Sequence, residues 1–315
     1  MKIKDLIEKI GNKDNGGVPN WMMGYFKRRT ISFFNGQSDN TTDVCWIQSK
    51  NFTIDLRLPK NPVKNKDVNK YSIRDLDEVA NYEGWVADSI YDGEKLSWSG
   101  GVSYLNHNKW PEPAFLKKVG NCMLEFSPSD VYVEDWRLQN HKKGPLIGLE
   151  LVEETNLTTN MVTRKGGGLI ISAEFAAICL GREPKVDESF QNQEKSLEEI
   201  LLDENTIIKE KEEILKFETS VAKGDLESGY TIYLSTSPNR NDKKLFLLDG
   251  YEYDEKNNQI IQTFTDHNQM YKRVYTIDFI DLEFDFATQT NTTDEAKAWF
   301  EQEKRTLNRH LEILK

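Results

Sequence analysis

The segment Ser129–Leu138 (SDVYVEDWRL) places an acid between two aromatic side chains on one face of an expected strand. Side chains alternate between the faces of a strand, so Tyr132, Glu134 and Trp136 share a face. A glutamate held among rings away from water has a raised pKa unless a positive charge pairs with it. Such a residue can bind the polar group of a ligand or act as a general acid or base, assisted by Tyr132. The alternative is an internal salt bridge that closes a barrel floor and binds nothing.

Two arginines are candidate partners for that glutamate or for a ligand. Arg57 lies in an expected strand (FTIDLRLP) on the same face as Asp55, and Arg182 follows another strand-like segment. A guanidinium holds a carboxylate or phosphate through two parallel hydrogen bonds. If Asp55 and Arg57 face outward instead, they form a surface ion pair that stabilises little. A regular hairpin would also bring Gln48 close to Arg57.

Tryptophan side chains supply the apolar surface of the expected site. Trp46, Trp98 and Trp136 lie in strand-like segments, where a ring can contact a ligand. Core packing is the alternative for each, and it is the commoner role of large aromatic residues in small barrels. The full set of candidate ligand-binding residues is Trp46, Gln48, Arg57, Trp98, Tyr132, Glu134, Trp136 and Arg182.

The sequence lacks the signatures of metal binding and covalent catalysis. The four histidines, of which His107 lies in an expected loop, have no metal-ligand spacing. The segment RKGGGLI lacks the second half of a phosphate-binding or dinucleotide-binding fingerprint. No serine lies in a nucleophile-elbow context. We therefore expect no metal and no cofactor.

Bulk composition excludes several classes of partner. The 315 residues carry a formal net charge of −11, which argues against nucleic acid or an anionic membrane as the main partner. No window approaches the roughly 20 apolar residues of a membrane span, and MKIKDLIEKI does not resemble a signal peptide. The three cysteines lack metal-type spacing, so we expect reduced thiols in a cytoplasmic protein.

Short strand-like segments dominate between residues 30 and 286. DVCWIQS and FTIDLRLP are close enough to form a hairpin, Asp92-Gly93 is a hairpin turn, and SPSD joins two more strands. Many short strands joined by hairpins predict a mainly β fold, an antiparallel β-barrel with short flanking helices. The mixed polar and aromatic face of its strands would line a lumen.

The helical segments are expected to flank the barrel within a single domain. Ser72 and Ser196 each begin a capping box, and Thr292 is expected to cap the last helix. The apolar stripe of that helix, which includes Trp299, should bury against the barrel, with a partner protein as the alternative. The expected parts are an N-terminal helix and lead-in (1–20), the β-barrel (21–290), a charged, partly helical insertion (about 183–213) and a C-terminal helix (292–315).

The order of these motifs resembles that of an uncharacterised group of calycin-type, lipocalin-like β-barrel proteins. WMMGYFKRRTISF is followed by DVCWIQSKNFTIDLRLP, YEGWV, LSWSGGVSYL, DVYVEDWRL, GGGLIISAEFAAICLGR and YTIYLSTSP, from about Trp21 to Pro238. The resemblance implies a barrel that holds a small apolar or amphipathic molecule. Unlike secreted lipocalins, the chain shows no signal peptide. Haem-binding calycins use a histidine near the end of the barrel, whereas here the only histidine in a late β-region, His267, falls in an expected turn.

These observations favour one function and leave two alternatives open. The favoured function is an intracellular lipocalin-like barrel that binds a small amphipathic or hydrophobic molecule in its lumen. The first alternative is an enzyme on the same barrel, with Glu134 as general acid or base and Tyr132 as its helper. The second is a protein-interaction module that uses the charged insertion and the C-terminal helix. The sequence does not identify the ligand.

Overall fold

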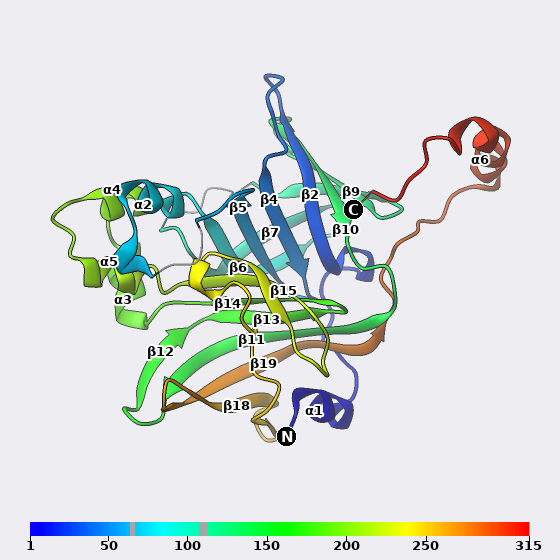
Figure 1. The fold of residues 1–315 in the computed structure, drawn as a ribbon. Helices are drawn as coiled ribbons and strands as arrows, with labels where there is room; N and C mark the ends of the chain where they lie inside the picture. The colour runs from blue at the N-terminus through cyan, green and yellow to red at the C-terminus, as the bar shows by residue number, and fades with distance from the viewer. Residues whose placement is uncertain (64–66, 107–111, 315) are drawn as a thin grey trace.

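Eight strands close into an antiparallel barrel in this computed structural model, which describes residues 1–63, 67–106 and 112–314 (Figure 1). Each strand pairs with the next along the chain, and the last pairs back onto the first, from Tyr132 opposite Phe33 to Leu138 opposite Phe26. The barrel strands are β2 (Gly24–Phe33), β4 (Thr42–Gln48), β5 (Phe52–Pro59), β6 (Glu83–Tyr91), β7 (Lys95–Ser103), β8 (Ala114–Val119), β9 (Cys122–Phe126) and β10 (Tyr132–Leu138). The predicted mainly β barrel fold is confirmed.

A second antiparallel sheet, open at its edges, takes up the rest of the β-structure. Its main path runs in the order β16-β15-β14-β13-β11-β19-β18-β17. Its strands are β11 (Gly144–Asn156), β12 (Met161–Lys165), β13 (Gly167–Ser172), β14 (Phe175–Leu180), β15 (Glu218–Lys223), β16 (Thr231–Ser235), β17 (Tyr251–Asp254), β18 (Gln259–Asp266) and β19 (Gln269–Phe284). Two-residue strands β1 (Lys13–Asp14) and β3 (Ser38–Asp39) pair with β19 and β2.

The barrel is therefore shorter than the expected range of residues 21–290. Only residues 24–138 contribute to it, and the strands after residue 144 belong to the second sheet. Strands of both sheets have the same period-two pattern and similar length, so local sequence does not distinguish them. The return of β10 to β2 closes the barrel, and this pairing joins segments about a hundred residues apart.

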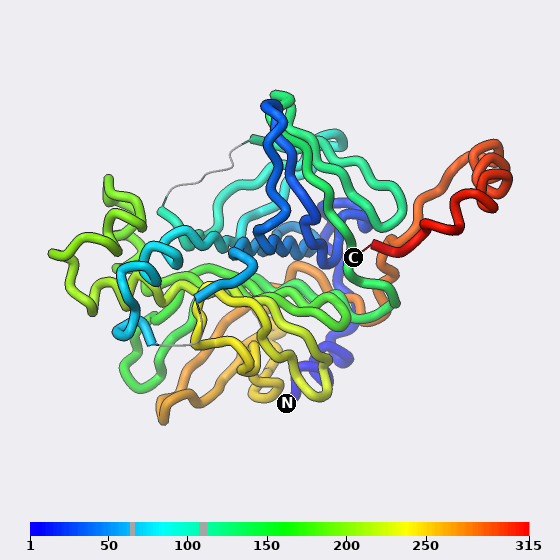
Figure 2. Tube along the Cα trace, turned by 45° about the horizontal axis from the view of Figure 1, so that its top comes forward, coloured from blue at the N-terminus to red at the C-terminus, as the bar shows by residue number. Residues whose placement is uncertain are grey.

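The two sheets pack face to face. Strands β13, β14 and β15 lie over β4, β5 and β6 of the barrel wall (Figures 1 and 2). Cys45, Ile54 and Leu56 point out of the barrel into this layer and are fully buried, as is Val221 of the second sheet. Burial of each aliphatic side chain among them, Ile54, Leu56 and Val221, stabilises the folded state by about 1.5–3 kcal/mol. The approach is so close at Gly84 that a Cβ there would lie 2.6 Å from Thr219 Oγ1.

The helices near the barrel follow their sequence signals. Helix α1 (Ile3–Ile10) buries Ile3, Leu6 and Ile7 against the outer face of the second sheet. The capping boxes at Ser72 and Ser196 are both present, at the starts of α2 (Ile73–Ala80) and α4 (Leu197–Leu202). The insertion also contains α3 (Pro184–Gln191) and α5 (Ile208–Ile214), and α4 packs against α2.

The C-terminal helix α6 (Asp294–Leu307) does not pack as expected. None of its side chains is buried, and Trp299 is 59% exposed. Both views show α6 standing apart from the two sheets (Figures 1 and 2). Its N-cap is Thr293, not Thr292. The sequence pattern shows which side of the helix is apolar, but it does not show whether the connection after Phe286 brings that side onto a surface.

Three further features of the structure concern membrane spans, thiols and metal sites. None of the described helices is both long and apolar enough to span a membrane. The three cysteines are free thiols. His107 lies outside the described residues, which contain no cluster of histidine, cysteine and acidic side chains arranged to hold a metal ion.

Candidate ligand cavity in the barrel lumen

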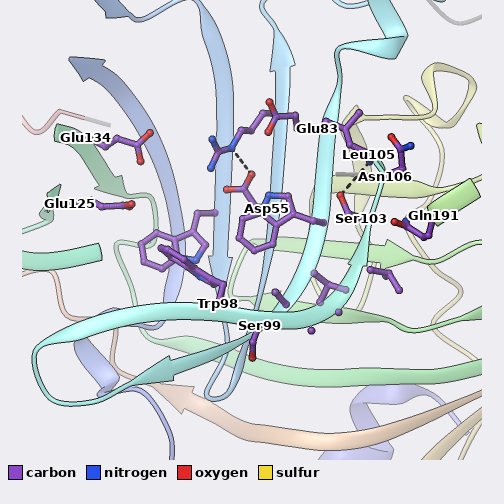
Figure 3. Close-up of a pocket in the computed structure, with 18 of the residues that line it drawn as sticks. Asp55, Glu83, Trp98, Ser99, Ser103, Leu105, Asn106, Glu125, Glu134 and Gln191 are labelled. Atoms are coloured by element: carbon purple, nitrogen blue, oxygen red, sulfur yellow. Dashed lines mark hydrogen bonds and ion pairs between the residues drawn. The ribbon is translucent and has the colours of Figure 1, made fainter. Parts of the chain in front are cut away.

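The barrel encloses a cavity of about 400 Å³ (Figure 3). This volume falls within the range of cavities that hold small molecules. Strands β4 to β7, β9 and β10 supply most of the wall, and helix α3 of the insertion adds Asp187 and Gln191. Gln191 and Asn106 lie across the cavity from Glu125 and Glu134 (Figure 3). Among the predicted ligand-binding residues, those that line the cavity are Trp46, Arg57, Trp98, Tyr132, Glu134 and Trp136.

The register of the β4–β5 hairpin determines which side chains face the lumen. Trp46 lies opposite Asp55, and Val44 lies opposite Arg57. Because side chains alternate along a strand, Trp46, Asp55 and Arg57 enter the lumen, whereas their neighbours pack under the second sheet. Asp55 and Arg57 therefore face inward, the orientation that makes them candidates for a ligand.

The expected approach of Gln48 to Arg57 is wrong. Gln48 lies opposite Thr53, four positions along β5 from Arg57. Its amide donates to the backbone carbonyls of Ser49 and Phe52 and accepts from the hydroxyl of Ser89 at 3.1 Å. Gln48 is thus a fully buried polar residue that ties strand ends together, and it is not among the residues that line the cavity.

Four tryptophans form the aromatic part of the wall. Trp46 and Trp136 meet edge to face with ring centroids 5.5 Å apart, and Trp85 and Trp98 do so at 6.3 Å. Edge-to-face pairs add to the stability gained from burial. The indole N–H groups of Trp46 and Trp98 are buried and have no hydrogen-bond partner in the described part of the chain. A buried N–H donor without an acceptor destabilises the folded protein. Each of these two groups would therefore gain from a hydrogen bond to a ligand or to water.

Glu134 is neutralised by an arginine that the sequence did not suggest. Its Oε1 accepts from Nη1 of Arg28 at 2.7 Å, and both side chains are almost fully buried. Nη2 of the same guanidinium binds Asp39 at 2.8 Å. Arg28 lies on β2, which the closure of the barrel brings beside β10. The predicted partners do not pair with Glu134 in the described part of the chain: Arg57 pairs with Asp55, and Arg182 pairs with Asp187.

Glu125 lies directly opposite Glu134 on the neighbouring strand β9 and has a different environment. It accepts hydrogen bonds from Nε1 of Trp136 at 2.9 Å and from the hydroxyl of Tyr132 at 3.1 Å. Burial, together with the charge of Glu134, raises the pKa of Glu125 to about 8, although Arg57 and these two hydrogen bonds oppose the rise. Within the described residues, no positively charged side chain forms an ion pair with Glu125. It therefore retains its proton at neutral pH.

Asp55 and Arg57 form the second charged pair of the lumen. Nε of Arg57 donates to Oδ1 of Asp55 at 2.8 Å. Burial raises the pKa of Asp55, although Arg57 opposes the rise. Burial also disfavours the charged guanidinium, but the carboxylates of Asp55, Glu134 and Glu83 outweigh that effect and raise the pKa of Arg57. Arg57 is thus held in its charged form by lumen acids.

Arg182 stabilises the insertion and does not line the cavity. Its guanidinium donates to the carbonyls of Ile214 and Tyr104, to the carbonyl of Ser103 at 3.0 Å, and to Asp187 at 3.2 Å. It also stacks near aromatic rings that include Phe190, 4.4 Å away. Because it joins the barrel to both ends of the insertion, Arg182 has a structural role, contrary to the prediction.

Sequence reasoning missed the acid that distinguishes this cavity. Glu125 lies in NCMLEFSP, one turn away from DVYVEDWRL. The pairing of Val133 with Phe126 across that turn places Glu125 opposite Glu134. Counting this register outward from the SPSD turn would have found the pair. Trp85 and Glu83, which also line the cavity, would have followed from their pairing with Asp55 and Arg57.

Comparisons of the chain with models of protein families, with curated proteins and with solved structures find no match.

Proposed function

We propose that the protein binds a small molecule in the lumen of its eight-stranded barrel. The main support for the proposal is the cavity of about 400 Å³, a space that the surrounding tryptophan side chains do not fill. Protein interiors are normally packed to the density of organic crystals, so a lumen that its own side chains do not fill has room for a small molecule.

The chemistry of the wall supports an amphipathic ligand. Trp46, Trp85, Trp98 and Trp136 offer flat apolar surfaces, and carboxyl and guanidinium groups lie between them. Apolar walls with a few placed polar groups are typical of small-molecule sites. The unpartnered indole N–H groups of Trp46 and Trp98 provide donors for a polar atom of the ligand.

The barrel topology supports a relationship to calycin-type, lipocalin-like proteins, which we include in the proposal. Strands β4 to β10 follow one another as consecutive antiparallel neighbours, and β2 closes the ring. The sequence motifs quoted above run through this ring and on into the second sheet. In such proteins the lumen is the ligand site, in agreement with the position of the cavity.

Acid–base catalysis is the second candidate function, because Glu125 and Glu134 differ in environment. Pairs of carboxyl groups with unlike surroundings commonly divide the roles of acid and base. Glu125 would donate a proton, and Glu134, held by Arg28, would accept one. This revises the hypothesis drawn from the sequence, in which Glu134 was the general acid or base and Tyr132 its helper. General acid–base catalysis contributes about 10²–10⁴ in rate, so Glu125→Gln should abolish most of any turnover.

Native mass spectrometry tests the binding function. The purified protein is incubated with a metabolite extract, desalted and measured intact, and the mass increment is then identified after denaturation. We expect one discrete small-molecule adduct per chain. A protein that remains at its bare mass, together with an experimental structure whose lumen is filled by side chains, would overturn the proposal.

A further inference from the structure

We propose that the lumen selects a ligand that carries a positively charged organic group, such as an alkylated ammonium, on an apolar body. This inference rests on the lumen being the ligand site. Its first support is the charge of the wall. The lining residues include one guanidinium, Arg57, and five carboxyl side chains, namely Asp55, Glu83, Glu125, Glu134 and Asp187.

The pairing of these acids shows where a positive charge is missing. Asp55 is paired with Arg57, Glu134 with Arg28, and Asp187 with Arg182. Glu125 is 5% exposed and receives hydrogen bonds only from the neutral donors of Trp136 and Tyr132, as far as the described residues go. A ligand cation beside Glu125 would give it the kind of partner that Asp55, Glu134 and Asp187 already have.

Aromatic rings stand next to this carboxyl group. The indole of Trp136 binds Glu125 through its N–H and meets Trp46 edge to face at 5.5 Å. The face of an indole attracts cations, and aromatic cages with nearby acids are a common means of binding quaternary ammonium groups. An ammonium in the lumen would therefore contact ring faces and carboxylates together.

An anionic ligand group would meet the opposite conditions. Arg57 is already bound to Asp55 and is surrounded by the further acids Glu83 and Glu134. A carboxylate or phosphate would have to displace Asp55 and approach these acids, and like charges at short range disfavour binding. We therefore propose that Arg57 neutralises carboxylates of the lumen and does not bind an anionic ligand.

Binding of a cation should be linked to release of a proton. The groups that face Glu125 are Glu134, Tyr132 and Trp136 from β10 and Arg57 from β5. Burial and the charge of Glu134 favour its protonated form, whereas Arg57 and the hydrogen bonds from Tyr132 and Trp136 oppose it. A ligand cation favours the ionised form. Affinity for a cation should therefore increase with pH as Glu125 ionises, whereas affinity for a neutral molecule of the same shape should not.

Calorimetric titration with two isosteric probes tests this inference. Choline and 3,3-dimethylbutan-1-ol have the same shape and differ in charge. At pH 8 we expect choline to bind the full-length protein about tenfold or more tightly than the neutral alcohol, the ratio expected of a desolvated cation–π contact. Glu125→Gln should reduce choline affinity about tenfold and leave the alcohol unaffected. Glu252→Gln, at an exposed position of β17, should change neither affinity.

The outcomes separate this inference from the proposed function. Equal affinity for the two probes overturns the inference and leaves a neutral-ligand barrel. A preference for choline that persists unchanged in a folded Glu125→Gln variant overturns the assignment to Glu125. If neither probe binds while the native mass spectrum shows an adduct of another class, the inference fails and the binding function stands. If no adduct appears either, both fail.

Discussion

Glu125 and Glu134 face each other across neighbouring strands of the barrel, yet among the described residues only Glu134 has a guanidinium partner. Two acids at the same depth in one lumen thus have opposite surroundings. Arg28 neutralises Glu134, whereas burial and the charge of Glu134 favour the protonated form of Glu125. In the described part of the chain, Glu125 therefore has no ion-pair partner of its own, although Arg57 lies near enough to influence its pKa.

Stability should depend on pH through Glu125. Its pKa is raised from 4.5 to about 8 in the folded protein, so between these values the folded state holds a proton that the unfolded chain has lost. The free energy of unfolding should therefore fall as pH rises from about 4.5 to about 8, and level off above that. Urea titrations across this range should show a shallower fall in Glu125→Gln than in the natural protein. A slope that the substitution leaves unchanged would contradict the assignment.

Replacing Arg182 should weaken the fold, because this side chain joins the insertion to the barrel. Arg182→Met leaves the buried carbonyls of Ile214 and Tyr104 without donors, so we expect a loss of about 2–4 kcal/mol in unfolding free energy. Limited proteolysis should cut the insertion faster, because Arg182 no longer joins it to the barrel. A variant as stable as the natural protein that has lost its ligand would instead restore the predicted binding role.

Removal of the C-terminal helix should cost little. Deleting residues 293–315 removes no buried side chain of α6. Among the described residues it removes one hydrogen bond to the rest of the chain, from Asn121 to the carbonyl of Leu314. The unfolding free energy should change by less than about 1 kcal/mol. The matched comparison is Leu6→Ala in α1, where a fully packed side chain is lost and about 2–5 kcal/mol is expected. A large loss on deletion would show that α6 packs on the barrel after all.

Much of the barrel could be predicted from local patterns. The hairpin between β4 and β5 and the Asp92-Gly93 turn between β6 and β7 follow from period-two alternation and turn chemistry. These signals extend over a few residues, so a single sequence contains them in full. Alternation also places Tyr132, Glu134 and Trp136 on one face of β10, but only the closed barrel shows that this face lines the lumen.

Features that depend on distant pairing could not be predicted in this way. The partner of Glu134 is Arg28, which is 106 residues away and comes close only when β10 returns to β2. The same closure fixes the extent of the barrel, which a count of strands overestimates. Arg182 was misassigned because a buried arginine has the same sequence signature whether it binds carbonyl groups or a ligand.

Filling the cavity tests the central claim most directly. Ala87 lines the lumen on β6, whereas Ile90 of the same strand is 54% exposed. Fluorescence titration with the neutral probe N-phenyl-1-naphthylamine should show binding to the natural protein and to Ile90→Phe with the same affinity. Ala87→Phe places a ring in the cavity and should leave the circular dichroism spectrum unchanged. It should bind the probe at least about tenfold more weakly, which is a loss of about 1.4 kcal/mol in binding free energy. Equal binding by folded Ala87→Phe, or no binding by the natural protein, would contradict a ligand site in the barrel lumen.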